Sequence, residues 1–366
     1  MQEDFHYYAT YCAAIIAGYT HAESLDIAYS AQFVDLCSKT VLVKLKAPVN
    51  AATTQLQLEL MDARTDIIGI QDITRIWSSF HFLPRDLYAQ KDKRPKNYMN
   101  RYRLICGPNG ELVKKTVELA KGRPLQWAGI AMHVLADTWA HMNFAGTPSL
   151  VINNAGEFTE IMPEGEEFPL AFRHNPSAPD DLDGHLYTNS LLQREENSIM
   201  NLGHGRAGHL PDYSFIRYRY MPAWDDYRLT EKDNPSDYYR AFTQMVYAMR
   251  YLHGDLDDFE VDRYDQDSVS VHKDRIFDIL TKRQLLASDD WKAFGEELSG
   301  EEIPGFDLDR YQDEYMKAPG KERDDTFIGR FIQGAIAQKT MVSKEIFESG
   351  NMLAGFVHTG EAGSKA

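Results

Sequence analysis

One segment of the sequence carries metal-ligand residue types at helical spacing. His133, Asp137 and His141 follow one another at intervals of four residues. On a helix this spacing places the three side chains within about 80° of arc, in a stripe two turns long. Imidazole nitrogens and carboxylate oxygens are common ligands of zinc and similar first-row metals. Because such groups are costly to bury without partners, the stripe predicts a metal site, with separately hydrogen-bonded core residues as the alternative.

A second cluster of ligand-type residues lies between Gly203 and Asp212. It contains His204, His209 and Asp212, interleaved with glycines that let the backbone pass close to an ion. A surface turn with incidental histidines is the alternative interpretation. Taken together with the His133 motif, the cluster is interpreted as part of the same metal site.

Three weaker signals occur earlier in the chain. Asp4 and His6 lie together near the start, Asp35 lies in an apolar stretch, and His81 stands between two phenylalanines. Each residue alone is typical of a hydrogen-bonded core position. Jointly they would supply the further ligands that a multinuclear metal site needs.

Several familiar catalytic signatures are missing from the sequence. There is no His-Glu-x-x-His zinc-protease helix, and none of the 12 histidines is followed by Asp. Glu-x-x-His occurs only at Glu3–His6, whereas a di-iron carboxylate bundle needs two copies on different helices. A Gly-rich phosphate loop and a Gly-x-Ser-x-Gly elbow are also missing.

With these residues in this order, the chain resembles the zinc-dependent phospholipase C and single-strand nuclease superfamily over roughly residues 4–255. The segments 5–10, 31–35 and 80–84 also resemble an uncharacterised bacterial branch of it. The resemblance implies an all-α fold around three zinc ions. It assigns ligand roles, in chain order, to His6, Asp35, His81, His133, Asp137, His141, His204 or His209, and Asp212.

The start of the chain departs from that superfamily. Its members usually begin with a Trp whose free amine and carbonyl chelate one zinc, whereas this sequence begins with Met1. We expect Asp4 to replace that chelate, since it lies two residues before His6.

The resemblance implies metal-assisted hydrolysis of phosphate esters, of a phosphodiesterase or phospholipase C type. Asp137 is the expected bridging carboxylate, and Asp35 is the expected ligand that also orients the attacking water. Two or three zinc ions are the expected cofactors, with iron or manganese left open. Two alternatives stay open: a metal-stabilised binding or scaffold protein without turnover, and a redox iron site built from the same residues.

The amino-acid composition limits the classes of substrate and binding partner that we expect for this protein. The 366 residues include 39 Lys and Arg against 55 Asp and Glu, a formal net charge of −16. Such a charge disfavours long nucleic acids, and no strong membrane signal is visible, so a small phosphate ester is the expected substrate. The three cysteines form no disulfide framework. Without a signal peptide or membrane span, we expect a cytoplasmic protein. The oligomeric state is not indicated.

The patterns around these residues predict a single all-α domain over residues 1–366. Its parts are a metal-ligand core at about 4–255, an irregular insertion at 146–200 and C-terminal helices at 256–350. The alternating residues 54–60 favour a strand or an exposed hairpin. Helices are predicted over 7–17, 22–45, 111–121, 124–143, 237–252, 270–286 and 326–348.

Overall fold

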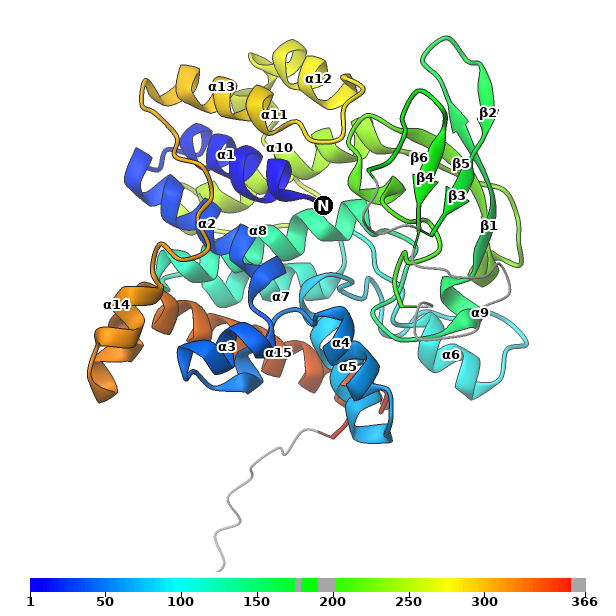
Figure 1. Cartoon of the computed structure of the whole chain (residues 1–366), viewed down its shortest axis with the longest axis horizontal. Helices are drawn as coiled ribbons and strands as arrows, with labels where there is room; N and C mark the ends of the chain where they lie inside the picture. The colour runs from blue at the N-terminus through cyan, green and yellow to red at the C-terminus, as the bar shows by residue number, and fades with distance from the viewer. Residues whose placement is uncertain (175–178, 190–201, 357–366) are drawn as a thin grey trace, which may run out of the picture.

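The fold is mixed rather than all-α. The computed structural model describes residues 1–174, 179–189 and 202–356, and of the chain 54% is helical and 9% is strand. The all-α prediction is therefore wrong, because the segment interpreted as an irregular insertion (146–200) begins a small sheet. Helices form a stack on one side of the molecule, and the strands lie together on the other (Figure 1).

The helices account for most of the chain. Their bounds are Thr10–Ile16 (α1), His21–Leu36 (α2), Lys39–Leu45 (α3), Gln57–Ala63 (α4), Ile67–Phe80 (α5), Lys96–Tyr102 (α6), Glu111–Ala120 (α7), Leu125–Ala140 (α8), Leu150–Asn153 (α9), Asn234–His253 (α10), Gln266–Ser270 (α11), Lys273–Thr281 (α12), Ser288–Ser299 (α13), Gln312–Lys317 (α14) and Phe327–Glu348 (α15). A π-helix, η1 (Asp4–Ala9), precedes α1, and a 3-10 turn, η4 (Leu210–Asp212), follows the glycine-rich cluster.

The strands form two sheets. An antiparallel sheet has the order β2-β1-β5-β6, and a parallel pair joins β3 to β4. Their bounds are Ala155–Ile161 (β1), Glu167–Pro169 (β2), Ala171–Arg173 (β3), Leu186–Thr188 (β4), Arg217–Pro222 (β5) and Thr230–Asp233 (β6). The sheets have an aromatic core of their own, which includes Phe144, Phe158 and Tyr220.

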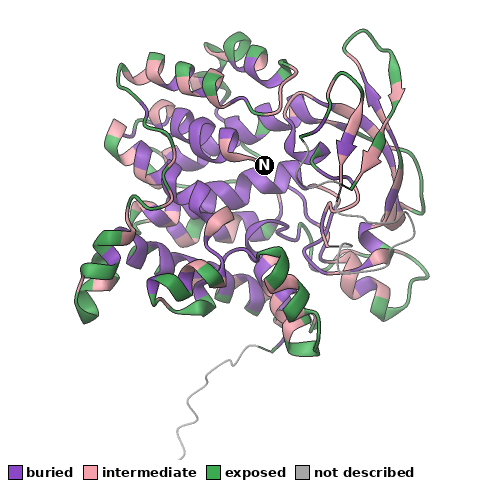
Figure 2. Cartoon of the chain, in the orientation of Figure 1, coloured by how far each residue is buried: buried purple, intermediate pink, exposed green. Residues whose placement is uncertain are grey.

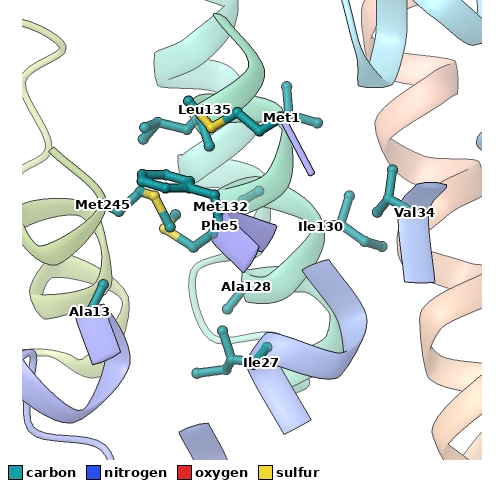
Figure 3. Packing of buried hydrophobic residues seen from close by; sticks show 14 of the residues in the cluster. Met1, Phe5, Ala13, Ile27, Val34, Ala128, Ile130, Met132, Leu135 and Met245 are labelled. Carbon is teal, nitrogen blue, oxygen red and sulfur yellow. The ribbon is translucent and has the colours of Figure 1, made fainter. Parts of the chain in front are cut away.

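Helix α8 lies at the centre of the helical stack. Fourteen of its 16 residues are buried, and Figure 2 shows it as a continuous buried rod. Apolar side chains surround it, among them Phe5, Val34 and Met245 from neighbouring elements (Figure 3). Gly129 lets α2 approach closely, since a Cβ there would lie 2.4 Å from the carbonyl oxygen of Ile27. The helix that carries the His133 motif is thus held by packing on all sides.

Most predicted helices are confirmed, with changed ends. A Thr20–Glu23 capping box begins α2, but the helix predicted over 22–45 ends at Leu36, and Ser38 caps a separate α3. The strand predicted at 54–60 is wrong, because Gln57–Ala63 is helical and forms a hairpin with α5. Residues 175–178 and 190–201 of the predicted insertion lie outside the described residues.

No described helix is both long enough and apolar enough to cross a bilayer.

Candidate metal centre

Eight of the ten predicted ligands converge on one buried site beside the centre of the molecule. They come from segments far apart in the sequence: the first turns of the chain, α2, the end of α5, α8, and the loop that precedes η4. The eight residues are His6, Asp35, His81, His133, Asp137, His141, His204 and Asp212.

The eight side chains form three groups, and in each group the ligand atoms lie within 4.8 Å of one another. His133 belongs to two of the groups, and the third adjoins them where His141 Nδ1 lies 3.5 Å from Asp137 Oδ2. The first triad is His6, His133 and Asp137; the second triad is Asp35, His81 and His133; the third triad is His141, His204 and Asp212.

Two histidine nitrogens face each other where both must be hydrogen-bond acceptors. His133 Nδ1 lies 2.9 Å from the Ala31 carbonyl oxygen, and His81 Nε2 lies 3.0 Å from the Thr53 carbonyl oxygen. A carbonyl only accepts, so each of these nitrogens carries a ring proton, and in the neutral form that binds metal the other nitrogen of each ring has a free lone pair. The remaining nitrogens, His133 Nε2 and His81 Nδ1, then meet lone pair to lone pair at 3.3 Å. A cation between them would turn this repulsion into attraction.

The third triad repeats the arrangement. His141 Nδ1 lies 2.7 Å from the His81 carbonyl oxygen, and His204 Nδ1 lies 2.7 Å from the Gly208 carbonyl oxygen. Both rings thus turn Nε2 toward Asp212, at 3.1 and 3.7 Å from its carboxylate oxygens, and in the neutral form that binds metal this nitrogen is the free one. Fixing the tautomer through the outer nitrogen is the usual arrangement for metal-binding histidines.

His6 is buried without a hydrogen bond from either ring nitrogen to any described residue. Its ring stacks on that of His133 with centroids 3.8 Å apart, and its Nε2 faces Asp137 Oδ1 at 3.2 Å. An unsatisfied buried imidazole is costly. A metal ion bound by the first triad would satisfy the Nε2 nitrogen.

Asp137 lies where the three triads meet. Its Oδ2 is 3.2 Å from both His133 Nε2 and His81 Nδ1, and 3.5 Å from His141 Nδ1. Its Oδ1 is 3.2 Å from His6 Nε2. Two ligands at about 2.0–2.1 Å from a tetrahedral zinc lie about 3.3–3.4 Å apart. The separations in the site therefore suit an ion between them, and Asp137 is placed to bridge.

The amino group of Met1 occupies the junction between the first and third triads. It lies 2.8 Å from Asp137 Oδ1, 3.2 Å from Asp212 Oδ1 and 3.2 Å from His141 Nε2. Burial opposes its charge, but the carboxylates of Asp137, Asp212 and Asp35 outweigh burial and raise the pKa of the amine to about 11. The carboxylates thus favour a positive charge at the position of the amine. A divalent metal ion nearby would carry a larger positive charge.

The protonation states suit metal binding. Burial lowers the pKa values of His6, His133 and His204 to about 4, so these rings are neutral at pH 7. Burial alone would raise the pKa of Asp137, but neighbouring imidazoles and the Met1 amine hold that pKa well below its ordinary value. Neutral imidazoles and ionised carboxylates are the forms that bind metal.

Asp4 is not part of the cluster, and the prediction that it replaces the N-terminal chelate is wrong. Its carboxylate accepts hydrogen bonds from the backbone N–H groups of Phe5 and Ala287, at 2.8 and 2.9 Å. Residues two apart on a helical turn face opposite sides, so Asp4 points away when His6 points inward. The Met1 amine lies where Asp4 was expected.

Of the two alternatives His204 and His209, the structure brings His204 into the cluster. His209 Nδ1 lies 3.6 Å from Asp212 Oδ2, but its side chain is 57% exposed and it belongs to none of the triads. It lies instead on the wall of a cavity of about 810 Å³, which His204 also lines.

That cavity is mainly apolar. Trp77, Phe82, Leu60 and Leu285 contribute to its walls, and no Lys or Arg occurs among the lining residues that the structure describes. The third triad is thus the part of the cluster that borders open space, whereas all three members of the first triad are buried.

Two features of the site were missed from the sequence. The Met1 amine is a backbone group, so no side chain in the sequence indicated its role. The backbone carbonyls that orient the histidines belong to residues that come close only in the folded chain. Gly129 carried a weak signal, as a small residue in an apolar helix one turn before His133.

A comparison with known protein families shows which family the chain belongs to. A family of unknown function, DUF6765, matches residues 1–346. The chain belongs to this family. No curated protein and no solved structure showed significant similarity to the chain. Membership in DUF6765 does not test the resemblance to the phospholipase C and nuclease superfamily, which stays a prediction.

Proposed function

We propose that this protein is a metal-dependent hydrolase of phosphate esters that uses two or three divalent ions, with zinc as the preferred ion. The observation that carries the proposal is the His81–His133 contact. Two unprotonated nitrogens face each other at 3.3 Å beside the ionised Asp137, in a buried site. Burying these nitrogens and the carboxylate side by side raises the free energy of the folded protein unless a cation lies between them.

The number of ligands in each triad supports catalysis rather than structure alone. Structural zinc is usually held by four protein ligands, whereas catalytic zinc has three and keeps one position open. The third triad offers three, and the first two share the one free nitrogen of His133, so none of the described groups has the four protein ligands of a structural site. Bound divalent ions would supply Lewis-acid activation of water and neutralise the charge on a phosphate ester.

Two aspartates of the chain, Asp137 and Asp35, have different roles beside the ions. Asp137, with a side chain 1% exposed, orients the surrounding histidines and fixes the spacing of the ions. The Asp35 side chain is 29% exposed, so it can contact a water molecule as well as the second triad. Burial raises the pKa of Asp35, which makes this carboxylate a better proton acceptor for attacking water.

The surroundings favour a small substrate over a polyanion. The described cavity wall lacks the Lys and Arg residues that hold a nucleic-acid backbone. A phosphate ester with an uncharged, partly apolar organic group fits the lining beside His204.

Metal analysis tests the proposal most simply. We expect two or three equivalents of zinc by plasma mass spectrometry in protein purified without chelator or nickel resin. Asp137→Asn should lose most of this metal, whereas the matched surface variant Asp274→Asn should keep it. Hydrolysis of bis(p-nitrophenyl) phosphate should then be abolished by chelation and restored by zinc.

Two outcomes would contradict the proposal. One equivalent or less in the folded wild-type protein would remove the multinuclear site. Full metal content without hydrolysis of any phosphate monoester or diester would favour the second candidate, a metal-stabilised binding protein. The complete burial of the first triad is the observation that favours this candidate.

A further inference from the structure

Residues 52–55 form a buried stretch of chain without helix or strand, between the 3-10 turn η2 (Val49–Ala51) and α4. All four residues are buried, and Thr53 has no exposed surface. Irregular segments usually run over the surface of a protein, because their backbone polar groups lack the regular partners of a helix or sheet. A buried irregular segment needs specific partners for these groups, and here the partners lie beside the candidate metal centre.

Every polar group of Thr53 has a hydrogen-bond partner. Its N–H donates to the Cys37 carbonyl oxygen at 2.9 Å, and its hydroxyl donates to the Val34 carbonyl oxygen at 2.6 Å. Its own carbonyl oxygen accepts from His81 Nε2 at 3.0 Å. One residue therefore connects the end of α2 to the histidine that follows α5.

The hydroxyl of Thr53 restrains the last turn of α2. The last four carbonyls of a helix have no partners within the helix, and the Val34 carbonyl is one of them because α2 ends at Leu36. Thr53 supplies the missing donor one residue before Asp35, which belongs to the second triad. The hydroxyl thus holds the backbone that carries Asp35.

The carbonyl of Thr53 restrains the opposite side of the same triad. His81 Nδ1 lies 3.7 Å from Asp35 Oδ1, and both groups belong to the second triad. Because the Thr53 carbonyl holds the other nitrogen of the His81 ring, it sets the direction in which Nδ1 points. Thr53 therefore controls the separation of two ligand groups, although it is not itself a member of the cluster.

The peptide group that precedes Thr53 is held by a buried lysine. Lys339 of α15 is buried, and its Nζ donates to the Ala52 carbonyl oxygen at 3.0 Å. Among the described residues, no carboxylate forms an ion pair with this ammonium group. Burial lowers the pKa of Lys339 to about 8, because a charge without a counter-ion is costly in the core. The contact restrains the peptide that joins Ala52 to Thr53.

We propose that Thr53 is a positioning residue of the metal centre: by holding the end of α2 and the His81 ring, it sets the geometry of the ion position in the second triad. The inference rests on the proposed function, because it assumes that the cluster binds metal, but it does not require hydrolysis. Without the hydroxyl, the last turn of α2 is free to move relative to His81, and the ion at this position binds more weakly.

Zinc affinity, measured by competition with a chromogenic chelator, tests the inference. Thr53→Val nearly keeps the shape of the side chain and removes the hydroxyl, so we expect one zinc equivalent to bind about 10- to 100-fold more weakly. Thr53→Ser keeps the hydroxyl and should bind zinc with nearly wild-type affinity. The matched control is Thr243→Val, because the fully buried Thr243 hydroxyl also donates to a backbone carbonyl, that of Arg240, at 3.0 Å.

The stability of the metal-free proteins separates positioning from a purely structural role. We expect Thr53→Val and Thr243→Val to lower the free energy of unfolding in urea by similar amounts, whereas only Thr53→Val weakens zinc binding. Lys339→Met, which removes the donor to the Ala52 carbonyl, provides a second test if Thr53→Val does not fold. It should weaken the same zinc equivalent.

Unchanged zinc affinity in Thr53→Val and Lys339→Met would overturn the inference, and so would an equal loss of affinity in Thr243→Val. Wild-type protein that binds zinc and shows the expected loss in Thr53→Val, but hydrolyses no phosphate ester, would contradict the hydrolase function and support the role of Thr53. Hydrolysis by the wild type with unchanged zinc affinity in Thr53→Val would do the reverse. Absence of zinc binding by the wild type would overturn both.

Discussion

The helical region supplies six of the eight clustered ligands, and the sheet-and-loop region at 146–233 supplies the other two, His204 and Asp212. In the helical region, α8 and its neighbours bury His6, His133 and Asp137 completely. In the sheet-and-loop region, His204 is held by a glycine-rich turn on the wall of the cavity. In the proposed metal centre the helical region would hold most of each ion's ligands, and the sheet-and-loop region would complete the site beside the cavity.

The third triad depends on both regions, because His141 follows α8 and its two partners belong to the sheet-and-loop region. The first and second triads contain only residues of the helical region. Variants in the two regions should therefore have unequal effects.

The largest difference is expected between His133→Ala and His204→Ala. His133 Nε2 can bind one ion, and Asp137 connects that position to the neighbouring His6, so His133→Ala should lose one equivalent of metal outright and weaken the binding of a second, whereas His204→Ala should lose no more than one. Metal content by plasma mass spectrometry measures this directly, with folding checked by circular dichroism. Equal losses would show that the two regions do not divide the ligands as the structure indicates.

A buried ion pair connects the two regions. Lys232 of β6 donates to Asp237, at 2.6 Å, and to the Trp139 carbonyl oxygen at the end of α8, at 3.0 Å. Lys232→Met leaves a buried carboxylate unpaired and should lower the free energy of unfolding by about 3–5 kcal/mol. Lys232→Met/Asp237→Leu should recover most of this loss in urea denaturation. A single variant as stable as the wild type would mean that this pair does not hold the regions together.

Two glycines, Gly129 in the helical region and Gly203 in the sheet-and-loop region, allow the packing of the two regions to be compared. Gly129→Ala places a Cβ 2.4 Å from the Ile27 carbonyl oxygen, between α2 and α8, and should cost about 1–3 kcal/mol of unfolding free energy. Gly203→Ala places a Cβ 2.2 Å from the buried Phe82 ring at a positive φ of 54°, and should cost at least as much. Urea denaturation of both variants tests this expectation, and a much smaller loss for Gly203→Ala would contradict it.

A further comparison concerns the pH dependence of the stability of the metal-free protein. His6, His133 and His204 have folded-state pKa values of about 4, below the ordinary 6.5. Unfolding therefore takes up protons between about pH 4 and 6.5, and the free energy of unfolding falls as the pH falls through this range. His204→Gln should reduce the slope by about one proton. An unchanged slope would contradict the neutral, buried state of His204.

The sequence predicted which side chains lie together better than it predicted the fold. The four-residue spacing of His133, Asp137 and His141 placed three of the clustered residues on one helix and its end, because that signal is local. Asp4 was misplaced because its relation to His6 depends on whether the backbone is helical. The sheet was missed although β5 alternates buried and half-buried residues over Arg217–Pro222. Its partner β1 lies more than fifty residues earlier and is interrupted by a register shift.

The most direct test of the central claim is anomalous X-ray diffraction at the zinc edge, on crystals of the metal-loaded protein. We predict at least two anomalous peaks within a few ångströms of Asp137, one of them between His81 and His133. No peak at these residues, or a single peak elsewhere on the molecule, would contradict the proposed metal centre.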